Sequence, residues 1–134
     1  MREIKFRGFP KSEYAIKKYG EKMLYNFGDA YDNDKLNDLI ELEQKHFHLM
    51  QFTGLLDKHG KEIYEGDICQ IWNVKGDKIV ENYTGYAEMV EGCWHLVRNG
   101  ERTTIFSFAI YCKRGSKQGI EIIGNIYENP ELIK

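Results

Sequence analysis

The chain has 134 residues, the size of one ordinary domain, and folding at that length can bury a core without disulfides or metal ions. Apolar residues make up 42% of the sequence and charged residues 30%, which excludes a disordered or fibrous chain. The net charge of -2 gives no overall basic field that would attract nucleic acid or a membrane surface.

The N-terminal third is predicted to hold a strand, a short second strand and the only substantial helix. Ile4 and Phe6 alternate with charged neighbours, the pattern of a half-buried strand, and Pro10 ends it because proline cannot donate to a ladder. Alternating apolar residues over 23–27 indicate the second strand. Apolar residues at helical spacing predict the helix between about 32 and 46.

From residue 46 onward the chain reads as strands and turns. Asn99-Gly100 and Glu91-Gly92 each separate two alternating apolar runs, which predicts two hairpins. Gly85, inside a long extended segment, indicates a bulge or a bend. The remaining strands are expected over 46–52, 63–72 with an interruption at 66–67, 79–90, 93–97, 103–112 and 120–127.

Short strands at this spacing favour a mainly β fold with a minor α element. We expect a small barrel-like or sandwich arrangement of short antiparallel strands, with one helix in the N-terminal third. Asn129 followed by Pro130 predicts a cap and the start of one short terminal helical turn. No linker or repeat divides the sequence, so residues 1–134 are expected to form a single domain.

Neither membrane insertion nor export is expected. The longest apolar run, residues 105–112, is too short to span a bilayer. Charged residues at 2, 3, 5 and 7 leave no apolar segment of a secretory signal. Three cysteines without close spacing suit a reducing compartment, so we expect a cytoplasmic protein.

Two residue pairs have the spacing of metal ligands. His46 and His48 would share one face of a strand, as would Cys93 and His95. Cys69 and Cys112 could add ligands. A zinc site usually shows two closely spaced pairs such as Cys-x-x-Cys, however, and this sequence has none, while isolated cysteines mostly behave as small apolar residues. The sequence also lacks a nucleophile elbow and a phosphate-binding glycine loop. We therefore expect no metal, no cofactor and no catalytic residue.

An acidic cluster is the main argument for an enzyme. Glu62, Glu65 and Asp67 lie within six residues, and Tyr64 stands between them. Carboxylates so close can act as acid and base or bind a hard cation. The other interpretation is a solvated turn between inward-pointing apolar residues, which we favour because the calcium-loop spacing is absent.

The one dense basic segment is a loop that follows several aromatic residues. Lys113, Arg114 and Lys117 carry its charge. Adjacent basic and aromatic residues suit a nucleic-acid surface, but three charges make few phosphate contacts. We favour a solubilising loop and keep a weak nucleic-acid-binding accessory protein as an alternative. The residues we expect at an interaction surface are Lys113, Arg114, Lys117, Tyr64, Glu65 and Asp67.

Three blocks of sequence resemble the YopX family of phage and prophage proteins. They are residues 2–7, 49–68 and 120–132, in that order. The family usually continues its first strand with Arg-Ala-Trp-Asp, whereas this chain has Arg-Gly-Phe-Pro at 7–10, and residues 11–45 form a variable segment with no counterpart. The resemblance implies a mainly β protein with a small barrel-like part, encoded by a phage or prophage and present in the bacterial host cytoplasm. It implies no catalytic residues.

We expect a non-enzymatic binding protein that acts on a host or phage protein and also associates with itself. Nine Tyr, seven Phe and two Trp are a high aromatic load, and aromatic residues are favoured at the centres of interfaces. A net charge near zero opposes self-association only weakly. The alternatives are an enzyme with an acid/base site around Glu62, Glu65 and Asp67, and the nucleic-acid-binding accessory protein.

Overall fold

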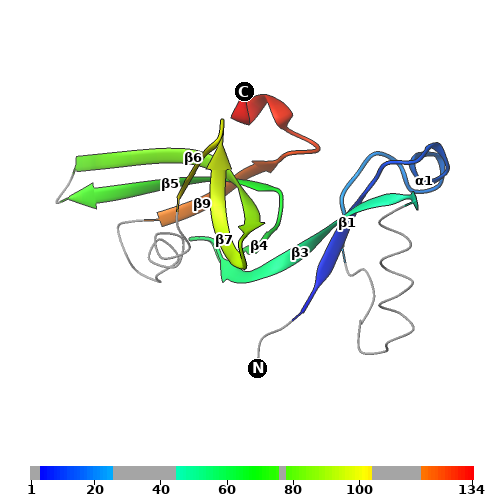
Figure 1. The fold of residues 1–134 in the computed structure, drawn as a ribbon, viewed down its shortest axis with the longest axis horizontal. Coiled ribbons are helices and arrows are strands. Elements are labelled where there is room, and N and C mark those ends of the chain that lie inside the picture. Colours follow the sequence, from blue (N-terminus) through cyan, green and yellow to red (C-terminus); the bar gives the residue numbers. More distant parts are fainter. Residues whose placement is uncertain (1–3, 26–44, 76–77, 104–118) are drawn as a thin grey trace. The chain divides into compact units, whose positions relative to one another are not determined.

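A computed structural model describes the chain except for residues 1–3, 26–44, 76–77 and 104–118 (Figure 1). Its internal contacts divide the chain into two compact units, Met1–Phe52 and Thr53–Lys134, and each is described by itself below. The described residues form two antiparallel sheets, one of them a half-barrel, with little helix. This confirms the predicted mainly β fold. The single domain expected from the sequence stays a prediction.

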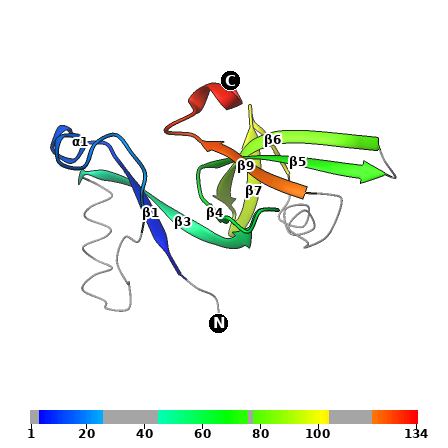
Figure 2. The ribbon, with the colours of Figure 1, turned by 180° about the vertical axis from the view of Figure 1, so that it is seen from behind.

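The first unit is built around strand β1 (Phe6–Pro10). It pairs antiparallel with β2 (Leu24–Tyr25) on one side and with the first part of β3 (Phe47–Leu56) on the other. Figure 2 shows β1 beside β3. Pro10 is the last residue of β1, as predicted. β2 confirms part of the short strand expected over 23–27, and residues 26–27 lie outside the described residues. Among the described residues of this unit, the buried side chains are Arg7, Pro10, Ala15, Phe47, Met50 and Phe52.

Helix α1 (Glu13–Tyr19) was not predicted from the sequence. The Ser12 hydroxyl caps it by accepting a hydrogen bond from the Ala15 backbone N–H at 3.1 Å. Gly20, at a φ of 81°, ends it in a conformation that favours glycine. The helix that the sequence predicted between about 32 and 46 falls mostly on 26–44, outside the described residues.

The second unit contains a five-stranded antiparallel sheet in the order β8-β7-β6-β5-β9. Its strands are β5 (Asp67–Lys75), β6 (Lys78–Val90), β7 (Cys93–Arg98), β8 (Glu101–Thr103) and β9 (Gly119–Asn125). A short strand, β4 (Glu62–Tyr64), precedes them. The core of the unit consists of buried side chains from these strands, namely Ile63, Cys69, Ile71, Ala87, Leu96 and Ile120.

Both predicted hairpins are present in this sheet. Glu91 and Gly92 connect β6 to β7 with φ angles of 52° and 81°. Asn99 and Gly100 connect β7 to β8 with φ angles of 48° and 81°. Two successive positive φ angles define the tight turn whose twist matches that of paired strands. These turns fix which residues of the three strands lie opposite one another.

Of the bulge or bend predicted at Gly85, the bulge is absent from the ladder between β5 and β6, and the bend stays a prediction. Gly85 pairs with Cys69 in a regular stretch, and the irregularity between β5 and β6 lies at Asn73 and Val74 instead. A Cβ atom at Gly85 would lie 2.8 Å from the carbonyl oxygen of Val97 and 3.0 Å from its nitrogen. The position therefore requires glycine because the backbone of β7 passes too close for any side chain.

The terminal helical turn is confirmed, but its predicted cap is not. Pro130 begins the 3-10 helix η1 (Pro130–Ile133), whereas the Asn129 side chain makes no capping hydrogen bond to it. The Asn129 amide oxygen instead accepts the backbone N–H of Asn125 at 3.2 Å. Asn129 thus stabilises the end of β9 and not the start of η1.

Candidate functional site

Asp57 organises the turn that follows β3. Its side chain is only 5% exposed. One carboxylate oxygen accepts the backbone N–H groups of His59 at 2.8 Å and Lys61 at 2.9 Å, and the other accepts that of Ile122 at 3.3 Å. The backbone N–H of Lys58 also donates to the carbonyl of Ile120 at 2.9 Å. The turn at 57–61 is thereby fastened to β9.

The acidic cluster predicted as an alternative enzyme site lies at the turn between β4 and β5. Asp67 is 3% exposed, and its carboxylate accepts the backbone N–H of Tyr64 at 2.8 Å. Tyr64 is also buried, while Glu62 and Glu65 are partly exposed. Within the described ranges, no three His, Cys, Asp or Glu side chains gather closely enough to hold a metal ion. Asp67 therefore serves to close this turn.

The histidines considered as metal ligands lie against neighbouring protein groups. The Nδ1 atom of His46 is 2.9 Å from the Ser12 hydroxyl, and its ring centroid is 5.3 Å from that of Tyr14. The Nδ1 atom of His95 is 3.1 Å from the carbonyl oxygen of Cys93. The basic residues Lys113, Arg114 and Lys117 lie outside the described residues.

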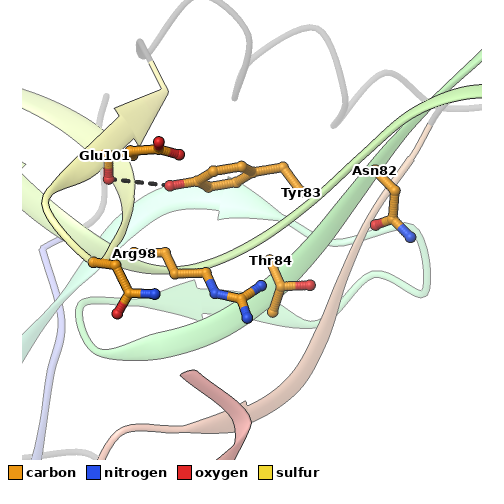
Figure 3. A pocket seen from close by; sticks show the side chains of 6 residues that line it. Asn82, Tyr83, Thr84, Arg98 and Glu101 are labelled. Atoms are coloured by element: carbon orange, nitrogen blue, oxygen red, sulfur yellow. Dashed lines mark hydrogen bonds between the residues drawn. The ribbon is translucent and has the colours of Figure 1, made fainter. Parts of the chain in front are cut away.

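A polar pocket that sequence reasoning missed lies on the second unit, where β6 meets the β7–β8 hairpin (Figure 3). Its volume is about 440 Å³. Three successive residues of β6 and three residues at the hairpin line it: Asn82, Tyr83, Thr84, Arg98, Asn99 and Glu101. The pocket combines one cationic, one anionic and several neutral hydrogen-bonding side chains. Such a lining can bind a small polar group.

A hydrogen bond ties Tyr83 to the β7–β8 hairpin at one side of this pocket. The Tyr83 hydroxyl donates to the backbone carbonyl of Glu101 at 3.0 Å. Burial raises the pKa of Tyr83, and the negative charge of Glu101 raises it further, while Arg98 acts in the opposite direction. In Figure 3 the Arg98 guanidinium reaches toward Thr84, and the Glu101 carboxylate lies by the Tyr83 hydroxyl. Across the part of the chain that the structure describes, no carboxylate forms an ion pair with Arg98.

The comparison with protein families decides the membership of the chain. The sequence model of the family described as "YopX protein" matches residues 5–134. The chain belongs to the YopX family. No curated protein matches the sequence of this YopX chain.

The fold of this YopX protein resembles that of a solved structure. The crystal structure of protein EF1440 from Enterococcus faecalis matches with a TM-score of 0.60 and 23% sequence identity, over 100% of each chain. At that identity the likeness shows a shared fold. No helix among the described residues of this YopX protein is long and apolar enough to cross a membrane.

In the last of the three family-like blocks (residues 2–7, 49–68 and 120–132), the side chain of Asn125 stabilises the turn that follows β9. The Asn125 amide oxygen accepts the backbone N–H groups of Tyr127 at 3.1 Å and Glu128 at 2.9 Å. Its amide nitrogen donates to the Glu128 carboxylate at 3.2 Å. Asn125, like Asp57 and Asp67 in the second block, is thus engaged with the backbone of its own turn.

Proposed function

We propose that this YopX protein acts by binding a protein partner and not by catalysis. The observation that carries the proposal is the use of polar side chains in the family-like blocks. Asp57, Asp67 and Asn125 are almost fully buried, and each accepts hydrogen bonds from backbone N–H groups. A general acid or base must instead reach a substrate proton. These blocks specify a fold, which leaves function to the exposed surface.

Exposed apolar and aromatic side chains support a role in contact with another protein. Tyr14 and Tyr25 of the first unit are 58% and 56% exposed. Leu56, Met89 and Ile123 of the second unit are each more than a third exposed. Aromatic side chains and methionine are enriched where proteins meet. The proposal includes a host or phage protein as partner, a phage or prophage origin and a cytoplasmic location, and these details rest on the family resemblance.

Affinity capture tests this function. The tagged full chain, expressed in bacterial cells, is expected to retain one host or phage protein in near-equal amount, identified by mass spectrometry. The purified partner should then form a complex with the purified chain on size-exclusion chromatography. A tagged protein of unrelated fold is the control. Capture of nothing beyond the control, or failure to reconstitute the complex, would contradict the proposal.

The proposal extends to association with a second copy of the chain. Exposed apolar side chains and a net charge of -2 both permit it. Light scattering over a concentration series is expected to show a mass that rises above 15.8 kDa, the mass of one chain. A mass that stays at that value at every concentration would identify a monomer.

A further inference from the structure

We infer that the pocket between β6 and the β7–β8 hairpin binds a carboxylate group, supplied by an aspartate or glutamate side chain of the protein partner. The inference rests on the proposed function and deepens it, because it names the chemistry that the partner must present. The pocket is formed entirely by residues of the second unit. It therefore exists within one compact part of the chain.

The guanidinium of Arg98 is the group that would bind the carboxylate. Arg98 is the last residue of β7, directly before the tight Asn99-Gly100 turn, so its backbone is held by the hairpin. A guanidinium presents its N–H groups as a planar fork that matches two carboxylate oxygens. Glu101 lies opposite Arg98 in the hairpin, but within the described ranges neither it nor any other carboxylate forms an ion pair with Arg98. A ligand can therefore supply one.

Neutral side chains of the pocket offer further donors. The Thr84 side chain lies beside the guanidinium, and its hydroxyl points away from Arg98, toward the side on which Asn82 lies (Figure 3). The Asn82 amide oxygen accepts a hydrogen bond from the Gln70 side chain at 3.0 Å, so the amide NH₂ group is the part of Asn82 left to donate to a ligand. Each oxygen of a carboxylate can accept more than one hydrogen bond, so hydroxyl and amide donors can bond to a carboxylate that the guanidinium already holds.

The charge of the pocket favours a singly charged ligand. Among the described residues that line the pocket, Arg98 is the one cation and Glu101 the one anion. A carboxylate bound at Arg98 carries a single negative charge, whereas a phosphate group with two charges would be repelled more strongly by Glu101. A volume of about 440 Å³ is enough for an acidic side chain together with part of its peptide backbone. An acidic segment of a protein fits these properties.

Nuclear magnetic resonance titration of the full chain tests the inference. The probes are N-acetylglutamate N-methylamide, its uncharged glutamine counterpart and inorganic phosphate. We expect saturable shifts of the backbone amides of Thr84, Arg98 and Asn99 with the glutamate compound alone. Arg98→Gln should weaken this binding by about tenfold or more. Arg102→Gln, which changes an exposed arginine of β8 that does not line the pocket, should leave it unchanged.

The outcomes separate this inference from the proposed function. Equal shifts with the glutamine compound, no loss in Arg98→Gln, or stronger binding of phosphate at the same amides would overturn the carboxylate assignment. If Arg98→Gln does not fold, Arg98→Lys replaces it, since it keeps the charge, loses the fork and should bind more weakly. A captured partner without any response to the glutamate compound would overturn the inference alone. A response without any captured partner would overturn the proposed function, and with it the protein source of the carboxylate, but would leave carboxylate binding by the pocket standing.

Discussion

Replacing Asp57 with alanine is expected to lower the free energy of unfolding of the second unit by about 3 kcal/mol. The carboxylate accepts three backbone N–H groups, from His59, Lys61 and Ile122, and the substitution leaves all three without this acceptor. Losing a hydrogen bond to a charged group, or leaving a buried donor unsatisfied, costs about 1–3 kcal/mol. The cost is smaller where water can reach the freed N–H groups of this turn. The measurement is urea denaturation followed by tryptophan fluorescence. Both tryptophans, Trp72 and Trp94, lie in the second unit.

Two further variants identify the cause of this loss. Asp57→Asn keeps one acceptor oxygen for the turn but sets an NH₂ group against the N–H of Ile122, so its loss should be about half as large. Glu131→Ala removes an exposed carboxylate near the C-terminus and should change stability by less than about 0.5 kcal/mol. An Asp57→Ala protein as stable as the Glu131→Ala protein would show that the turn does not depend on Asp57.

Replacing Gly85 with alanine is expected to destabilise the second unit by about 2–4 kcal/mol. The added Cβ atom would lie 2.8 Å from the carbonyl oxygen of Val97 and 2.9 Å from Cε1 of Tyr83. The oxygen belongs to a paired strand and cannot move without disturbing the ladder between β6 and β7, and overpacking of this kind usually costs 1–3 kcal/mol or slightly more, about the range expected here. The same fluorescence-detected denaturation measures the loss.

Gly92→Ala is the matched control for this variant. Gly92 has a φ of 81° but open space around its Cβ position, so alanine there costs only the strain of a left-handed conformation, about 1 kcal/mol. If Gly85→Ala were the milder of the two variants, the close approach of β7 to Gly85 would be wrong.

The sequence predicted best the features that depend on neighbouring residues. The hairpins at Glu91-Gly92 and Asn99-Gly100 follow from turns that need two positive φ angles, a property of two adjacent residues. Helix α1 was missed because seven residues are too few to show a helical period. Its start is further fixed by a distant residue, since the Lys11 N–H donates to the His46 carbonyl at 2.8 Å.

The features that the sequence did not reveal depend on strand register. Gly85 looks like a bulge in the sequence, and only its position beside Val97 explains why glycine is required. The pocket likewise brings Thr84 together with Arg98, which is fourteen residues away in the chain. The Glu91-Gly92 turn sets the register of β6 against β7 that places both residues at the pocket. The register implied by that turn is the feature of the sequence that could have indicated the pocket.

Amide hydrogen exchange of the wild-type protein and of Asp57→Ala tests most directly the claim that polar side chains of the family-like blocks hold the backbone. In the wild-type protein the amides of His59 and Lys61, which lie in an exposed turn, are predicted to exchange far more slowly than free loop amides. In Asp57→Ala both should lose this protection, while the Tyr64 amide, held by Asp67, should keep more of it. Exchange of the His59 and Lys61 amides at free-loop rates in the wild-type protein would contradict the claim.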